Sequence, residues 1–373
     1  MKRSRSLPAG ILPSQSYRSF VASGQIAADV PVRDDQIQPA SIDLRLGAKA
    51  YRVAAGFMPG DGNSVAGKLD KLRMHVVDLR EGAVLERGCV YVIPLQERLK
   101  LPADISGTAN PKSTTGRLDI FTRLLCDGAR EFEKVPAGYA GPLYLEVSPR
   151  TFSILVRTGQ TLNQLRLRRG APIFSDKALA ALDKRLGLVF SPDESRERAQ
   201  IGQGLWISID LEGPKGDTIG YRARHNTPLV DLSKIGHYAP SEFWEPIRRN
   251  RQRSLVLNPD DFYILVSREK IRVPHAYAAE MVPYDTSVGE FRIHYAGFFD
   301  PGFGYGKNDI QGTRAVLEVR SHDVPFLLEH GQIVGRFAFE HLTAVPDRIY
   351  GMGIGSNYQR QGLTLAKQFK RKG

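Results

Sequence analysis

The chain carries one pattern twice, as LERGCVYVIPLQERLKLP at residues 85–102 and as LNPDDFYILVSREKIRVP at residues 257–274. An offset of 172 residues superimposes Tyr91 on Tyr263 and Pro102 on Pro274. The same offset relates the segment at 143–147 to that at 315–319, and Gly-Gln at 159–160 to Gly-Gln at 331–332. Agreement at several separate places indicates a tandem duplication.

Both copies are rich in short apolar or alternating runs separated by Gly, Pro and Asp. This pattern predicts strands and turns, and therefore a mainly β fold made of two tandem barrels or jelly rolls. The expected strands are 90–95, 143–147, 153–156, 262–266, 315–319 and 333–339. A few short helices are expected, among them 16–23 before Gly24 and 176–185 after a capping Ser175.

A length of 373 residues suits two domains. We expect a first copy at 1–172 and a linker with a helix at 173–203, which includes the polar stretch 191–203. The second copy is expected at 204–345, and a C-terminal lid or tail at 346–373.

The composition is that of a globular protein, with 42% hydrophobic and 25% charged residues. No apolar run is long enough for a membrane helix, and residues 7–11 are too short for a signal-peptide core. We therefore expect a cytoplasmic protein that does not span a membrane. The two cysteines, Cys89 and Cys126, predict neither a disulfide framework nor a zinc site.

Positive charge is in excess, with 52 Lys and Arg against 40 Asp and Glu and a net charge of +12. Such a chain is attracted to polyanions, although charge alone does not separate nucleic acid from nucleotide. Basic clusters occur at residues 166–169, 248–253 and 367–372, and we expect them to be solvated surface.

The segment NPKSTTGR at residues 110–117 concentrates the polar chemistry. Lys112 and Arg117 supply two cations, Ser113, Thr114 and Thr115 supply hydroxyls, and Gly116 exposes its backbone. This composition suits a polyphosphate held by charge-assisted hydrogen bonds. A polar hairpin loop is the alternative for this segment alone.

Several motifs, in order along the chain, resemble those of the dCTP deaminase and dUTPase superfamily. They are IQPASIDLRLG at 37–47, NPKSTTGR at 110–117, AGFFDPGF at 296–303, GQIVGRFAFE at 331–340 and YGMGIGSNYQRQG at 350–362. The resemblance implies dUTPase-like barrels and a nucleoside triphosphate substrate.

The resemblance also implies a site that deaminates without zinc, and the sequence has no His-x-Glu with Pro-Cys-x-x-Cys. Glu318, or Glu146 in the other copy, would move protons, while Ser113 and Arg117 orient water and stabilise charge. Asp300 would accept the sugar 3′-hydroxyl above the ring of Phe303. The remaining substrate-binding residues would be Lys112, Thr114, Thr115, Gly116, Ala296, Val316, Leu317, Tyr350, Asn357 and Gln361. Mg²⁺ would be bound through the triphosphate.

Neither copy holds a complete set of these motifs. The first copy lacks the Asp-Pro-Gly loop, and the second reads PYDTSVG at 283–289 where the basic segment belongs. We therefore expect a composite site, with Glu146 as a relic or a second, degenerate site. Lys112 stands where the family has arginine, Asn357 stands for a lid lysine, and Gly297-Phe298 stands for a His-Arg pair.

The function expected is hydrolysis of dCTP to dUTP and ammonia by a homo-oligomer, a trimer or dimer of chains. The alternatives are a dUTP pyrophosphatase, a bifunctional deaminase forming dUMP, and an inactive nucleotide sensor or nucleic-acid binder. A nucleic-acid partner is not expected for the enzyme.

Overall fold

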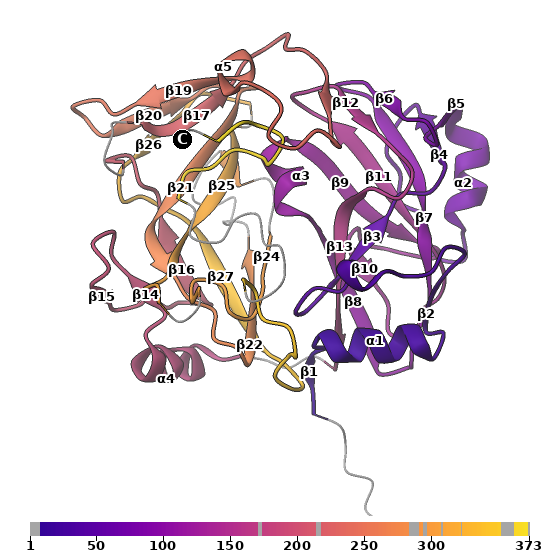
Figure 1. Cartoon of the computed structure of the whole chain (residues 1–373), viewed down its shortest axis with the longest axis horizontal. Coiled ribbons are helices and arrows are strands. Elements are labelled where there is room, and N and C mark those ends of the chain that lie inside the picture. The colour runs from indigo at the N-terminus through magenta and orange to yellow at the C-terminus, as the bar shows by residue number, and fades with distance from the viewer. Residues whose placement is uncertain are drawn as a thin grey trace, which may run out of the picture.

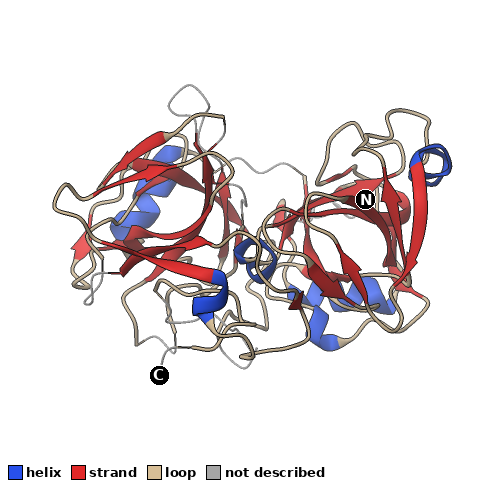
Figure 2. Ribbon diagram, turned by 90° about the horizontal axis from the view of Figure 1, so that it is seen from above, coloured by secondary structure: helices blue, strands red, loops and turns tan. Residues whose placement is uncertain are grey.

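The computed structural model describes residues 8–170, 174–213, 218–282, 291–293, 297–306, 309–321, 323–351 and 362–371, and of 291–293 the backbone only. Two β-rich halves lie side by side, indigo to magenta and salmon to yellow in Figure 1. Seen from above, strands curve around the interior of each half (Figure 2). The expected mainly β architecture with a few short helices is confirmed.

The first half contains two large sheets and one small sheet. The first sheet has the order β1-β13-β8-β10, with β3 beside β13: Gly10–Ile11 (β1), Thr161–Arg169 (β13), Ile105–Pro111 (β8), Lys134–Val135 (β10) and Ile42–Arg45 (β3). The second has the order β5-β4-β7-β11-β9, with β2 beside β7: Arg73–Asp78 (β5), Lys49–Val53 (β4), Val90–Lys100 (β7), Ala140–Pro149 (β11), Ile120–Cys126 (β9) and Ile26–Ala28 (β2). The small sheet joins Val230–Asp231 (β18), Ile154–Val156 (β12) and Ala83–Leu85 (β6).

The second half repeats this plan. One sheet has the order β15-β14-β21-β17-β19, with β25 beside β21 and β23 beside β25: Arg196–Glu197 (β15), Val189–Phe190 (β14), Phe262–Ile271 (β21), Thr218–Ala223 (β17), Trp244–Arg248 (β19), Thr313–Ser321 (β25) and Phe291–Ile293 (β23). Another has the order β16-β27-β22-β24: Leu205–Ser208, Ile333–His341, Tyr277–Val282 and Phe298–Phe299. A two-stranded ribbon joins Ser254–Leu257 (β20) to Phe326–Glu329 (β26).

The structure confirms the duplication, because strands and strand partners in the two halves correspond at the same offset of 172 residues. The offset of 172 residues places β27 on β13 from the first residue to the last. In the first half Glu146 of β11 lies opposite Val92 of β7, and in the second Glu318 of β25 lies opposite Ile264 of β21. The two glutamates therefore occupy equivalent positions in equivalent sheets.

The two expected helices form, as α1 (Ser14–Ala22) and α4 (Asp176–Leu186). The Ser175 hydroxyl caps α4 by accepting a hydrogen bond from the backbone of Ala178 (3.3 Å). The other short helices are α2 (Val65–Leu72), α3 (Ser113–Arg117), α5 (Pro240–Phe243) and the 3₁₀ turn η1 (Asp34–Gln36). No helix in the described ranges is both long and apolar enough to cross a membrane.

Each half has its own apolar core, but the first core also takes in residues from the second half of the sequence. Phe243 and Trp244, at the junction of α5 and β19, and Phe369 of the C-terminal segment pack into it. Of the basic clusters, 248–253 is exposed as expected, whereas Arg166 is completely buried. The prediction of a solvated surface is therefore wrong for Arg166, because the second half covers that face of β13.

Candidate active site

A short helix between the halves carries the polar segment singled out in the sequence. Lys112 follows β8 with extended backbone angles, and α3 begins at Ser113. Residues four apart lie on one face of a helix, so Ser113 and Arg117 project together. The opposite face is fixed by the Thr115 hydroxyl, which donates to a main-chain carbonyl of β13 (2.7 Å). In Figure 1, α3 lies at the centre of the molecule and faces the second half.

The second half contributes a tight turn after β24. The backbone N–H of Phe303 donates to the carbonyl of Asp300 (3.0 Å) and closes this turn. Gly302 has a φ of +93°, and a Cβ there would lie 2.2 Å from the Ile349 side chain, so this position requires glycine. The Phe303 ring packs beside that of Tyr350, with 5.8 Å between ring centroids.

A carboxyl group from β25 completes the arrangement. The Glu318 residue is only 7% exposed. Burial raises the pKa of its carboxyl to about 7, and the positive charge of Arg117 acts in the opposite direction. Burial has the larger effect, so this group is close to half ionised at neutral pH and can both accept and return a proton.

These elements meet in one pocket of about 700 Å³, including its part open to solvent, and both halves form its wall. The predicted site residues that line it are Lys112, Ser113, Gly116, Arg117, Asp300, Phe303, Val316, Glu318 and Tyr350. Its wall also includes Pro111, Met281, Gly297, Phe298, Phe299, Arg314 and Ala315.

Other predicted residues lie elsewhere. The Leu317 side chain points into the core of the second half, because neighbours along a strand face opposite sides and Val316 and Glu318 face the pocket. Thr114 and Thr115 line an adjacent pocket. Ala296, Asn357 and Gln361 lie outside the described residues.

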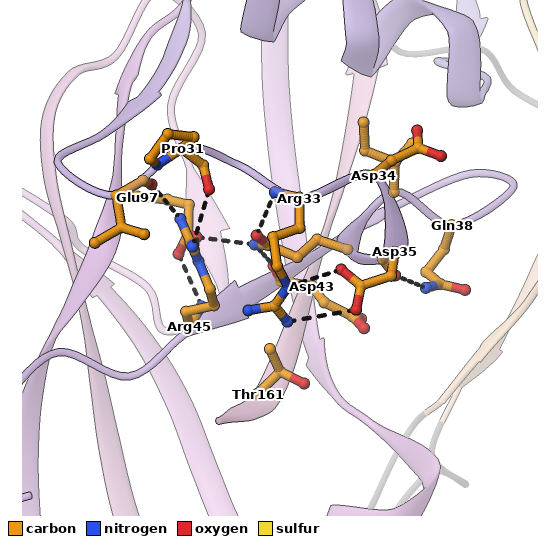
Figure 3. A network of polar contacts seen from close by, with 12 residues as sticks. Pro31, Arg33, Asp34, Asp35, Gln38, Asp43, Arg45, Glu97 and Thr161 are labelled. Atoms are coloured by element: carbon orange, nitrogen blue, oxygen red, sulfur yellow. Dashed lines mark hydrogen bonds and ion pairs between the residues drawn. The ribbon is translucent and has the colours of Figure 1, made fainter. Parts of the chain in front are cut away.

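The adjacent pocket, of about 860 Å³ including its part open to solvent, meets the first at Lys112, which lines both. Arg33 and Lys367 add two further cations, and Thr161 and Ser233 add hydroxyls. The Lys112 ammonium group contacts the Asp43 carboxylate and the Thr161 hydroxyl (2.9 Å). Figure 3 shows Asp43 and Thr161 close to Arg33.

Burial raises the pKa of the Asp43 carboxyl above its usual value, and the nearby Lys112 ammonium offsets only part of this effect. Sequence reasoning gave no role to Asp43, although it lies in the quoted segment IQPASIDLRLG. Its place within that motif was the available signal. Arg33 and Lys367 carried no comparable signal, because they approach Lys112 only through the fold.

The C-terminal segment reaches the site from the second half. Arg117 donates from Nη1 to the main-chain carbonyl of Thr364 (2.8 Å). Further along, the Phe369 ring packs edge-on against Phe243 (5.3 Å between centroids) and Trp244 (5.9 Å). The tail is therefore anchored in the core of the first half while it contacts Arg117.

The equivalent carboxyl group in the first copy has a different environment. Oε1 of Glu146 accepts a hydrogen bond from Nε of Arg123 (2.8 Å). A Cβ at Gly56 would lie 2.6 Å from Oε2 of Glu146, so the backbone covers the carboxyl group closely. Glu146 lines neither of the two pockets described above. The structure thus separates Glu146 from the predicted site residues gathered around Glu318.

Two arginines at the site were not assigned a role in the sequence. Arg314 lines the pocket, and Arg166 of β13 donates from Nη2 to Oδ1 of Asp300 (3.0 Å). Leu165 and Leu167 point into the core, so strand alternation predicts that Arg166, which lies between them, faces away from the core. Alternation does not predict what Arg166 contacts there. No group of three or more His, Cys, Asp or Glu side chains that could hold a metal ion occurs among the residues the structure describes.

Comparison with known proteins identifies the family. The models for the N-terminal and C-terminal domains of 2′-deoxycytidine 5′-triphosphate deaminase match residues 8–171 and 175–369. A crystal structure of 2′-deoxycytidine 5′-triphosphate deaminase from Agrobacterium tumefaciens is 53% identical, with a TM-score of 0.85, and the match covers 90% of this chain and 99% of that one.

Curated relatives are more distant. A "dCTP deaminase, dUMP-forming" from Beutenbergia cavernae is 27% identical over 42% of this chain and 77% of its own length. A "dCTP deaminase" from Sulfurisphaera tokodaii is 25% identical over 40% of this chain and 74% of its own length. The matches to both domain models and the similarity over nearly the whole length show that this chain belongs to the 2′-deoxycytidine 5′-triphosphate deaminase family.

Proposed function

We propose that the chain hydrolyses the 4-amino group of dCTP, giving dUTP and ammonia. The observation that carries this proposal is Glu318, a buried carboxyl group with a pKa of about 7 in a pocket that also contains Ser113 and Arg117. Deamination of cytosine needs a group that both takes and gives protons, and a carboxyl group near half ionisation at neutral pH does so.

The proton movements follow from the overall reaction. Water attacks C4, forming a C–O bond while N3 takes up a proton. The Glu318 carboxylate accepts the first proton of the water and passes it to N3. It then accepts the second proton and delivers it to the amino group, so that the C4–N bond breaks and ammonia leaves. Ser113 orients the water, and Arg117 stabilises the negative charge that develops.

The remaining residues have binding roles in this proposal. Lys112, Thr114, Thr115 and the backbone of Gly116 hold the phosphates, and the adjacent pocket gives the phosphate chain room beyond Lys112. Asp300 accepts the 3′-hydroxyl above Phe303. Val316, the backbone at Leu317, and Tyr350 enclose the base and sugar, with Ala296, Asn357 and Gln361 as further substrate contacts.

Mg²⁺ would accompany the triphosphate, and the residues near Lys112 fit such an ion. Oδ1 of Asp43 is buried without a hydrogen-bond partner among the described residues, which suits an acceptor for metal-bound water. Bound there, Mg²⁺ would neutralise phosphate charge. We propose that the proton transfers at Glu318 need no zinc.

A second candidate product is dUMP, because curated relatives such as that of Beutenbergia cavernae are named dUMP-forming.

The test incubates the purified chain with dCTP and Mg²⁺, with and without a zinc-selective chelator, and follows ammonia and nucleotides. Ammonia with dUTP supports the proposal, and ammonia with dUMP and pyrophosphate supports the bifunctional reading. Cleavage of added dUTP without ammonia would indicate a pyrophosphatase, and no turnover would indicate a binding protein.

We further propose a homo-oligomer, a trimer or dimer of chains, working in the cytoplasm. Val256 and Leu327 lie opposite each other on the β20–β26 ribbon and are 50% and 52% exposed. An exposed apolar pair of this kind supports contact with another copy. Light scattering coupled to gel filtration measures the oligomeric state directly, and a monomer would contradict it.

A further inference from the structure

Arg166 lies on β13 of the first half, but groups of the second half enclose its guanidinium. Nη2 donates to Oδ1 of Asp300 (3.0 Å), and Nη1 donates to the main-chain carbonyl of Ala279 in β22 (3.0 Å). The guanidinium carbon lies 3.9 Å from the centroid of the Phe298 ring, within the range of a cation–π contact. The side chain is 1% exposed, so these contacts fix its position.

The pKa of the Asp300 carboxyl is subject to two opposing effects. Burial raises the pKa of the Asp300 carboxyl, because desolvation disfavours the charged form, and Arg166 lowers it by charge and hydrogen bond. Oδ2 makes no hydrogen bond to any other residue in the described ranges, and Asp300 lines the pocket. The pair therefore leaves one carboxylate oxygen for a donor inside the pocket.

Stability alone does not explain a pair of this kind. Nε of Arg166 is buried with no hydrogen-bond partner among the described residues. A buried ion pair is on average no more stabilising than well-packed apolar residues of similar volume. The pair of Arg166 and Asp300 lies at the pocket wall and joins the first half to a pocket-lining carboxylate of the second half. This position indicates a role in binding.

We propose that Arg166 is a positioning residue: its hydrogen bond to Oδ1 fixes the Asp300 side chain and leaves Oδ2 for the sugar, and thereby sets selectivity for nucleotides that carry a 3′-hydroxyl. This inference rests on the proposed function, in which Asp300 accepts that hydroxyl. It makes the sugar site dependent on a residue that the other half supplies.

The test compares dCTP with its 3′-deoxy analogue, 2′,3′-dideoxycytidine triphosphate, as substrates of Arg166→Met. In this variant dCTP loses the hydrogen bond between its 3′-hydroxyl and Asp300, whereas the analogue has no 3′-hydroxyl and never makes that bond. The kcat/KM for dCTP should therefore fall roughly tenfold to hundredfold, while that for the analogue changes little. Arg166→Lys keeps the charge without the fork and should restore part of the selectivity. In a double-mutant cycle, Asp300→Asn should add no further loss of selectivity to Arg166→Met.

Arg168→Met is the matched control. Arg168 lies two residues along the same strand and pairs with Glu340 of the second half (3.1 Å), but it does not line the pocket. This variant should keep the ratio of kcat/KM between the two substrates. Equal losses on both substrates in Arg166→Met would show a structural role and overturn the inference. A wild-type chain that deaminates dCTP but does not prefer it over the analogue would overturn the role of Asp300, whereas no deamination at all would overturn the proposed function.

Discussion

At the scale of single residues, the site depends on a competition between burial and charge at Glu318. Desolvation raises the pKa of the carboxyl, Arg117 lowers it, and the result is about 7. The carboxylate is the form that accepts a proton from water. We therefore predict that kcat/KM for dCTP falls as the pH drops below about 7, with a limiting slope of one, in profiles recorded about two pH units either side of neutrality.

Glu318→Gln should lower kcat by roughly 10²–10⁴-fold and remove this pH dependence. Glu146→Gln should leave most of the activity, because Glu146 pairs with Arg123 outside both pockets. An inactive Glu146→Gln enzyme together with an active Glu318→Gln enzyme would contradict the assignment.

The same residue should reduce stability. The pKa of Glu318 rises from 4.5 in the unfolded chain to about 7 in the folded one, so between these values the folded state binds more protons and its stability falls as the pH rises. The full effect above pH 7 is about 3 kcal/mol at most. Urea unfolding should show Glu318→Gln gaining free energy of unfolding over wild type at pH 8, but not below pH 4.5.

Glu146→Gln provides the contrast for this measurement. Burial raises the pKa of the Glu146 carboxyl as well, but Glu146→Gln also removes the partner of Arg123, whose side chain is 28% exposed, so this variant should gain less free energy of unfolding at pH 8 than Glu318→Gln. A Glu318→Gln protein that is less stable than wild type at pH 8 would show that its carboxylate contributes to folding.

At the scale of elements, the two ends of the α3 segment should divide binding from chemistry. Lys112 lies before the helix, where the two pockets meet, and Arg117 lies at its end beside Glu318. Lys112→Ala should raise KM for dCTP roughly tenfold to hundredfold with a smaller effect on kcat, because it removes a charge-assisted contact to phosphate. Arg117→Ala should lower kcat by roughly 10²–10³-fold.

Steady-state kinetics with dCTP and dCMP separates the two roles. The Lys112→Ala variant should discriminate less between tri- and monophosphate than wild type, since dCMP lacks the phosphates that Lys112 contacts in the proposal. Arg117→Ala should reduce kcat for both nucleotides. A Lys112→Ala variant that mainly loses kcat, together with an Arg117→Ala variant that mainly raises KM, would contradict this assignment of binding to Lys112 and chemistry to Arg117.

Periodicity and motif spacing were sufficient for the elements but not for the contacts between them. The alternation at 315–319 predicted a strand with Glu318 beside apolar neighbours, and the structure has it in β25. Segment 113–117, for which a polar hairpin loop was the alternative, is a helix. Five residues carry too little periodicity to predict a helix. Arg166, Arg33 and Lys367 approach the site only through tertiary packing, which no pattern along the chain records.

At the scale of the whole molecule, the two halves have kept one fold and divided one site. The glutamates hold equivalent positions, yet Arg123 and the backbone near Gly56 surround Glu146, whereas α3, the turn at Asp300 and the C-terminal segment surround Glu318. In the main pocket the first half supplies Lys112, Ser113 and Arg117, and the second supplies Asp300, Glu318 and Arg314. Neither half therefore has the composition of a complete nucleotide site, and the tail that reaches Arg117 is anchored in the core of the first half.

This division predicts one nucleotide per chain. Isothermal titration of Glu318→Gln with dCTP and Mg²⁺ should give one site per chain, whatever the oligomeric state, because turnover is suppressed and the Glu146 position is covered. The double variant Glu318→Gln with Arg166→Met should keep that stoichiometry and bind more weakly. Two sites per chain would contradict this prediction and would mean that the first copy opens to admit nucleotide. In that case Arg123→Ala, which removes the side chain covering Glu146, should raise the occupancy of the second site. If the prediction holds, the same variant should leave the stoichiometry at one.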